Sequence, residues 1–187
     1  MIKQLKKHKE IFEKIQPFYS LAKQLGRLSS QYMNEGVREV SVTYAGNVLD
    51  FESSLLTKSL LSGFFTERIS TNVNDVNAML IAKERDITTG EKVSQDTFGY
   101  SNLITVTVKG DNHQLEVKGT YIENYGPRIV SINGYDVDIL PEGNLLFIQH
   151  TDRPGVIGRV GNILGDNSVN IATMQVGRKN VGGEAIM

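Results

Sequence analysis

Apolar residues recur at intervals of three and four along the first half of the chain, the spacing that places them on one face of a helix. The pattern predicts a first helix that begins near Ile11, is interrupted or restarted at Pro17 and stops near Gly36. It predicts a second helix over residues 50–65 and a third that Asn74 caps. The side chains expected to face the core are Phe18, Leu21, Leu25, Leu28, Tyr32, Leu55, Leu56, Leu60, Leu61, Phe64, Phe65, Val76, Met79 and Leu80.

The apolar spacing changes to two between and after these helices, as in β-strands with one buried face. Residues 37–45 alternate in this way. After residue 90 the same period predicts antiparallel strands, with Gly110–Asn112 as a tight turn and a short hairpin leading to residue 140. The predicted strands of this meander are 92–97, 102–108, 114–121 and 128–133.

The turn residues Pro141–Gly143 mark the clearest domain boundary. We therefore expect a basic lead-in over residues 1–9, one domain over residues 10–142, and a second module over residues 143–187.

The most distinctive stretch follows this boundary. Leu145–Ile148 is an uninterrupted apolar run, which predicts an inner strand covered on both faces. The run ends at His150–Asp152, and Pro154 suits the first turn of a helix. Each glycine inside a helix costs roughly 0.8–1.0 kcal/mol of stability relative to alanine. Because the helix after Pro154 contains several glycines, we expect a backbone or a ligand to approach it closely. The helix carries an apolar stripe of Val156, Ile157, Val160, Ile163 and Leu164 beside Gly155, Gly158, Gly161 and Gly165.

Polar groups gather at the predicted strand-to-helix turn. The Asp152 carboxylate, the His150 imidazole and the unpaired N–H groups of a helix start would lie close together. Helix N-termini favour anions whereas Asp152 favours a cation, so the combination fits a zwitterionic amino acid better than a phosphate. Asn170, early in the next strand, would add an amide donor and acceptor. The residues alone are equally consistent with a structural role, in which Asp152 only caps the helix and Asn170 only ends a turn.

Composition narrows the classes of function. The net charge of -1 and a pI near 6.3 disfavour nucleic-acid binding. The chain has no cysteine, which fits a reducing cytoplasm, and its three histidines are far apart, so we expect no metal site. No apolar run approaches the roughly 20 residues of a membrane span, and no signal peptide is expected. The glycine series from Gly155 to Gly161 lacks the spacing of a dinucleotide loop, and we expect neither catalytic residues nor a cofactor in this chain.

Several motifs carry a family resemblance. Residues 145–187, with TDRPGVIGRVGNILGDNSVNIATMQVGR, resemble the first half of an ACT domain, the βαββαβ module that binds amino-acid effectors, in the form found in D-3-phosphoglycerate dehydrogenases. The preceding domain, with PFYSLAKQLGRLSSQ, VNDVNAMLIAKERDI and GPRIVSINGYDVDILPEGNLLFI, is similar to the intervening domain of the long form of that enzyme, also called the allosteric substrate-binding domain. Met79 and Asp86 replace a proline and a glycine of its helix motif. The resemblance implies an α+β fold with an incomplete ferredoxin-like ACT module, in a fragment that lacks the catalytic domains.

The resemblance also implies a regulatory function. L-serine would bind between the ACT domains of neighbouring subunits in a homo-oligomer and inhibit the dehydrogenase of serine biosynthesis. By position, Asp152 and Asn170 would hold the amino-acid head group, His150 would lie beside it, and the amides near Gly155 and Val156 would complete the site.

Further expectations follow from the same resemblance. Arg128 matches a basic position of an anion site in the intervening domain, but Leu140 stands where a second basic residue is expected, so a solvated strand arginine is the alternative. The parent enzyme would use NAD in the cytoplasm, with its nicotinamide-binding domain outside this chain. Two other functions stay open: the regulatory part of an L-serine dehydratase subunit, and a purely structural oligomerisation module.

Overall fold

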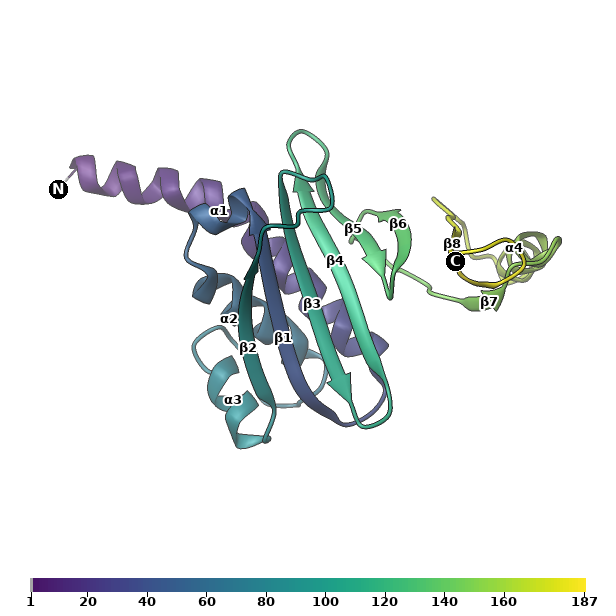
Figure 1. The fold of residues 1–187 in the computed structure, drawn as a ribbon, viewed down its shortest axis with the longest axis horizontal. Coiled ribbons are helices and arrows are strands. Elements are labelled where there is room, and N and C mark those ends of the chain that lie inside the picture. The colour runs from purple at the N-terminus through teal and green to yellow at the C-terminus, as the bar shows by residue number, and fades with distance from the viewer. Residues whose placement is uncertain (1) are drawn as a thin grey trace.

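The computed structural model describes the backbone of residues 2–187 and the side chains of residues 12–187, so the basic lead-in expected over residues 1–9 lies outside the described side chains. A large unit is followed by a small one (Figure 1). The large unit contains α1 (Ile2–Tyr32), β1 (Val37–Gly46), a 3-10 turn (Asn47–Asp50), α2 (Ser53–Thr66), α3 (Ala78–Glu84), β2 (Thr88–Ser94), β3 (Asn102–Gly110), β4 (Gln114–Ile122), β5 (Gly126–Ile132) and β6 (Tyr135–Ile139). The small unit contains β7 (Gln149–Thr151), α4 (Val156–Asp166), β8 (Gly177–Arg178) and β9 (Glu184–Ile186).

The main core lies between one face of a six-stranded sheet and the helices α1 and α2 (Figure 1). The strand order is β2-β1-β3-β4-β5-β6. The alternation predicted for β1, β3 and β4 is confirmed, since most of their apolar residues face the helices, while Ala45 and Leu103 join Val130 in a small separate cluster. The buried side chains of this layer include Val40, Val42, Tyr44, Ile104, Val106, Val108, Leu115 and Val117 from the strands and Leu21, Leu25, Leu60, Leu61, Phe64 and Phe65 from the helices.

Helices α1 and α2 meet backbone to backbone. A Cβ atom at Gly26 of α1 would overlap the carbonyl oxygen of Leu60, and one at Gly63 of α2 would overlap that of Lys23. Only glycine permits this approach, so these two positions set the distance between the helices.

Helix α1 is continuous through Pro17, where the sequence suggested an interruption. Proline inside a helix costs about 3 kcal/mol or more, because it removes a hydrogen bond and clashes with the preceding turn. Ile15 and Phe18 on either side of it are each only 7% exposed, and burying them helps to offset this cost.

The predicted direction of the first strand after residue 90 is wrong. β2 begins at Thr88, ends at Ser94 and pairs with β1 in the parallel direction, with Glu39 opposite Thr88 and Ala45 opposite Ser94. Between these two strands the chain passes through α2 and α3, and such a helical crossover returns it in the same direction. The meander from β3 to β6 is antiparallel, as expected.

The prediction that Val76, Met79 and Leu80 face the core is also wrong. Val76 is 91% exposed and the other two are exposed as well, whereas Ala78 and Ala82 are buried. Asn74 does cap the start of this segment: its side-chain oxygen accepts the N–H groups of Val76 and Asn77, and its carbonyl accepts the Ala78 N–H at 3.0 Å, in a turn that runs directly into α3. Helix α3 is therefore short and packs through its alanines.

The small sheet has the order β7-β9-β8, with β9 antiparallel to both neighbours. The α+β class with a ferredoxin-like module is confirmed. The inner strand expected over Leu145–Ile148 is wrong, because only Ile148 pairs, exchanging two backbone hydrogen bonds of 2.9 Å with Met187. Leu145 and Leu146 are 42% and 62% exposed, since no described layer covers both faces of this segment.

Side chains join the two units near the end of α1 and along β6. Gln149 donates a 2.8 Å hydrogen bond to the Tyr32 hydroxyl, and the Tyr135 hydroxyl lies 3.4 Å from the Glu184 carboxylate. The Lys179 ammonium lies 4.7 Å from the centre of the Tyr135 ring, a cation–π distance. The small unit is thus held against the large one by these polar contacts and by Ile186 of β9, which is 2% exposed and belongs to the main core.

Candidate ligand-binding site

Polar groups meet where β7 ends and the turn toward α4 begins. The Arg178 guanidinium, from the end of β8, donates a 2.9 Å hydrogen bond through Nη1 to Oδ2 of Asp152. The Asp152 N–H also donates to the Gly183 carbonyl at 2.8 Å, which ties this turn to the loop before β9. The Asp152 side chain is 19% exposed and that of Arg178 is 53% exposed, so the pair lies at the surface with the carboxylate on its inner side.

The charge of Asp152 is fixed by its surroundings. The hydrogen bond from Arg178 lowers the pKa of this carboxyl, and the Gly182 N–H group acts in the same direction. Burial raises the pKa, but less than the hydrogen bond lowers it, so the net shift is downward. Asp152 is therefore an anion at neutral pH, as the interpretation of this residue as an ammonium receptor requires.

His150 has unused hydrogen-bonding capacity beside this pair. Its Nδ1 lies 3.0 Å from the Thr151 carbonyl oxygen, while its Nε2 is buried and has no partner among the described residues. A buried polar atom left without a partner costs about 1–3 kcal/mol, so most such atoms in proteins are satisfied. A polar ligand atom at this position would supply the missing partner.

The start of α4 differs from the prediction. Pro154 and Gly155 form a turn, Gly155 is left-handed with φ 88°, and the helix begins at Val156. The Val156 N–H lies 3.4 Å from the Arg153 carbonyl oxygen, at the long end of hydrogen-bond distances. The amides expected to complete the site are thus at the helix start, adjoining Asp152 in sequence.

No described atom approaches the glycines of α4. A Cβ atom added at Gly155, Gly158, Gly161 or Gly165 would have nothing within 4 Å. The helix buries none of its residues, and Ile157 and Ile163 of its apolar stripe are 54% and 55% exposed. The close approach expected at this helix therefore stays a prediction, and the approaching group would have to be a ligand or another chain.

Asn170 lies apart from the cluster. The strand expected around it is absent from the described structure, since β8 covers only Gly177–Arg178 and Asn170 is exposed in the segment before it. No hydrogen bond among the described residues joins Asn170 to Asp152 or His150. The chain alone brings together His150, Asp152 and Arg178, and sequence reasoning missed the last of these.

Two protein-family models match this chain. Residues 14–133 match the model of the D-3-phosphoglycerate dehydrogenase intervening domain, and residues 144–187 match that of the ACT domain. The chain belongs to the D-3-phosphoglycerate dehydrogenase intervening-domain family. The cluster of His150, Asp152 and Arg178 lies in its ACT region.

Individual relatives agree with the family models. The chain is 52% identical over 179 residues to D-3-phosphoglycerate dehydrogenase of Bacillus subtilis, covering 96% of this chain and 34% of that protein. It is 38% identical over 174 residues to the enzyme of the same name from Methanocaldococcus jannaschii, covering 93% and 33%. The chain thus spans about a third of the length of these curated relatives.

Arg128, the candidate for an anion site in the intervening domain, already has an acidic neighbour. Its Nε lies 3.5 Å from Oδ1 of Asp138 on the next strand, and its side chain is 23% exposed. An anion bound there would compete with this carboxylate. Leu140 is 39% exposed and adds no charge, so the anion site stays a prediction.

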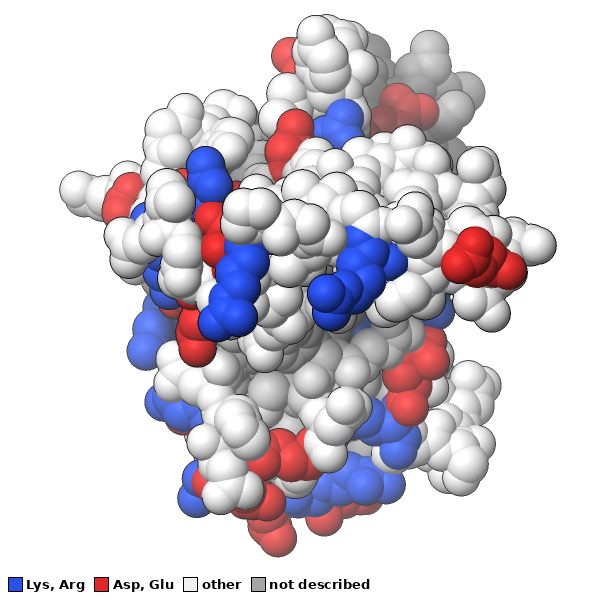
Figure 2. Space-filling model, turned by 90° about the vertical axis from the view of Figure 1, so that its right-hand side faces the viewer, with Lys and Arg blue, Asp and Glu red and all other residues white. Residues whose placement is uncertain are grey.

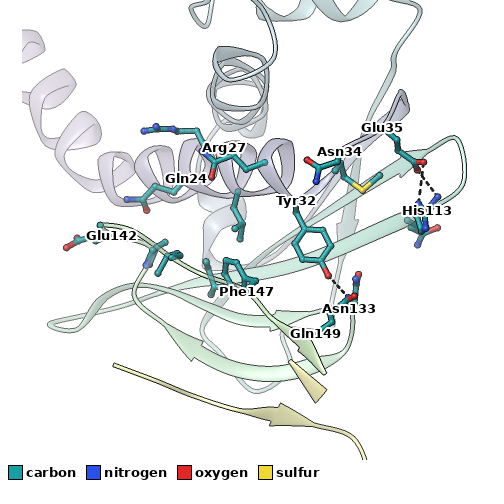
Figure 3. Close-up of a pocket in the computed structure, with 18 residues that line it drawn as sticks. Gln24, Arg27, Tyr32, Asn34, Glu35, His113, Asn133, Glu142, Phe147 and Gln149 are labelled. Atoms are coloured by element: carbon teal, nitrogen blue, oxygen red, sulfur yellow. Dashed lines mark hydrogen bonds and ion pairs between the residues drawn. The ribbon is translucent and has the colours of Figure 1, made fainter. Parts of the chain in front are cut away.

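A cleft of about 1050 Å³ lies elsewhere, between α1 and the segment that leads to β7 (Figure 3). Arg27 in its lining pairs with Glu67 at 2.8 Å, and Nδ1 of His113 lies 3.3 Å from the Glu35 carboxylate. Most of the residues that line this cleft belong to the intervening-domain region, whereas Asp152 and the unpartnered Nε2 of His150 lie in the region that matches the ACT domain. The candidate amino-acid site is therefore the turn at Asp152 rather than this cleft. The cleft is lined by amide and apolar side chains that include Gln24, Gln31, Asn34, Leu28, Leu145 and Phe147.

Other classes of site have little support in the described part of the chain. No group of three or more His, Cys, Asp or Glu side chains there is arranged to hold a metal ion. None of its helices has the length and apolar character needed to cross a membrane. Figure 2 shows basic and acidic side chains interspersed on the face that it presents.

Proposed function

We propose that this chain is the regulatory region of a D-3-phosphoglycerate dehydrogenase of serine biosynthesis, and that it binds L-serine for feedback inhibition. The observation that carries the proposal is the ionised Asp152 carboxylate, paired at 2.9 Å with Arg178 in a region that matches the ACT model. A fixed anion beside a fixed cation is complementary to an amino-acid zwitterion.

The ligand's small size sets a demanding requirement. Serine has about seven non-hydrogen atoms, so the best ligand efficiency of roughly -1.5 kcal/mol per atom limits its binding to near -10 kcal/mol. Micromolar affinity corresponds to about -8.2 kcal/mol, and reaching it requires that nearly every polar group of the ligand has a partner. Asp152 would take the ammonium, the unpartnered Nε2 of His150 a further polar group, and the amides of Gly155 and Val156 would complete the site.

A second copy of the chain would complete this site. The exposed stripe of α4, with Ile157 and Ile163, offers an apolar surface to it, and the uncovered glycines permit a close approach of helices. Asn170, which is separate from Asp152 within one chain, would then reach the ligand from the neighbouring subunit. We therefore propose a homo-oligomer in which serine lies between ACT regions.

Catalysis belongs to the parent enzyme in this proposal. The nicotinamide-binding and catalytic domains, and NAD with them, would lie outside these 187 residues, in a cytoplasmic enzyme. Regulation requires a coupling of about 1–3 kcal/mol between the serine site and the active site. The polar contacts between the two units, such as Gln149 with Tyr32, offer a physical route for it.

Isothermal titration calorimetry tests this function. We expect heat from L-serine, little from D-serine, and at least about a tenfold weaker L-serine affinity in Asp152→Ala, because hydrogen bonds to charged groups are worth about 1.5–3 kcal/mol. Asp166→Ala is the matched control, since Asp166 is an exposed residue at the end of α4. Absence of serine heat in the unsubstituted chain, or equal affinity in Asp152→Ala, would contradict the proposal and favour a purely structural oligomerisation module.

A further inference from the structure

Arg178 reaches the candidate site from across the small sheet. β9 lies between β7 and β8, and its residues Glu184 and Ala185 pair with Thr151 and Arg178 on its two sides. Neighbouring strands are about 4.8 Å apart, so the side chain crosses one whole strand to meet Asp152. The contact places its guanidinium beside the turn that carries His150 and Asp152.

Most of this guanidinium is unused. Arginine has five N–H donors in a planar fork, yet among the described residues only Nη1 of Arg178 makes a hydrogen bond, the one to Asp152. The Arg178 side chain is 53% exposed, so a ligand can approach it from solvent. A guanidinium can hold a second carboxylate through two parallel hydrogen bonds.

We infer that Arg178 is a specificity-determining residue of this site, which binds the α-carboxylate of the amino acid while Asp152 binds its ammonium. The inference rests on the proposed amino-acid site and adds to it the group that recognises the acid end. Without a cation the ligand's carboxylate would lie near the anion of Asp152, which repels it. With Arg178 in place, the two charges of the receptor match the two charges of a free amino acid and reject amines and amides that lack the acid.

The ligand pair L-serine and L-serine amide separates this role from a structural one. The amide keeps the ammonium and the hydroxyl but has no negative charge. We expect calorimetry to show that the unsubstituted chain prefers L-serine over the amide by about tenfold or more. Arg178→Gln should weaken the binding of L-serine by roughly 10- to 100-fold and change the affinity for the amide much less. The ratio of the two affinities should therefore fall toward one. Arg178→Lys should keep an intermediate preference, because it retains the charge without the fork.

Two further variants complete the experiment. Arg85→Gln makes the same change of charge at an exposed position of the large unit and should leave both affinities unchanged. Asp152→Asn should weaken the binding of both ligands, because both carry the ammonium. An Arg178→Gln chain that keeps the preference, loses both ligands equally, or binds both more tightly overturns the role of Arg178 while leaving the serine site standing. An unsubstituted chain that binds neither ligand overturns the serine site and this role together.

Discussion

The side-chain amide of Gln175 pairs with the backbone of Asp138 in both directions. Its Oε1 accepts the Asp138 N–H at 3.0 Å, and its Nε2 donates to the Asp138 carbonyl at 2.6 Å. β6 is the edge strand of the large sheet, and an edge strand presents backbone groups that need partners. One glutamine from the ACT region thus acts as a short strand on this edge and fixes where the small unit attaches.

Gln175→Ala tests this attachment. We expect faster hydrogen exchange of the Asp138 amide, because its N–H loses its partner, and a loss of about 1 kcal/mol in unfolding free energy, as hydrogen bonds contribute about 0.5–1.5 kcal/mol each and both are exposed here. Gln114→Ala, at an exposed glutamine of β4, is the control. Unchanged exchange at Asp138 would show that the glutamine does not hold the edge.

Gly26→Ala tests the backbone contact between α1 and α2. Its Cβ would overlap the Leu60 carbonyl oxygen, and overpacking of this kind costs about 1–3 kcal/mol. The same substitution at Gly158 of α4 meets no atom of its own chain within 4 Å and should stabilise the dissociated monomer by up to about 1 kcal/mol through helix propensity. Urea denaturation of both variants measures the two effects. Equal effects would contradict the assigned close contact.

The exposed stripe of α4 predicts self-association. Ile163→Glu should abolish dimers in sedimentation velocity without loss of folded stability, because this side chain is 55% exposed and the helix buries none of its residues. Asn162→Glu places the same charge on the neighbouring exposed position and serves as the control. A dimer that persists in Ile163→Glu would mean that another surface joins the copies.

Glu35 predicts how stability depends on pH. Burial raises the pKa of this carboxyl, but N–H hydrogen bonds from Asn112 and His113 outweigh that effect and lower the pKa to about 2. A carboxyl with a pKa below its unfolded value of 4.5 stabilises the fold above that value, and this contribution is lost as the pH falls from 4.5 toward 2.

Glu35→Gln removes this contribution. Urea denaturation should show the variant less stable than the parent chain at pH 6, with the difference shrinking between pH 4.5 and pH 2. Glu142→Gln, at an exposed glutamate, should follow the parent chain at every pH. A stability difference that does not change with pH would contradict the assigned role of the ionised carboxylate.

The sequence predicts the strands of the large sheet well for a physical reason. Residues of β1, β3 and β4 alternate because one face of the sheet is buried, and such alternation is visible without any tertiary information. The parallel pairing of β2 was not predictable in this way, because the direction of a strand depends on the crossover before it. The inward face of α3 was mispredicted because Ala78 and Ala82, which are buried there, are less apolar than the exposed Val76.

The candidate site was predictable only in part. His150 and Asp152 are adjacent to the end of an apolar run, so the sequence alone brings them together. Arg178 is 26 residues from Asp152, and they meet only because β9 inserts between β7 and β8. A charged residue at the end of the expected second strand was the one available sign. Among the described residues no hydrogen bond joins Asn170 to Asp152 or His150. Its predicted role in binding the ligand therefore depends on a second copy of the chain.

The central claim, that L-serine binds at the turn after β7, is tested most directly by backbone amide NMR of the chain titrated with L-serine. The account predicts chemical-shift changes concentrated at His150, Asp152, Gly155 and Val156, extending to Asn170 and Arg178, and absent with D-serine at the same concentration. Unshifted amides in this region, or shifts confined to the cleft residues near Gln24 and Phe147, would contradict it.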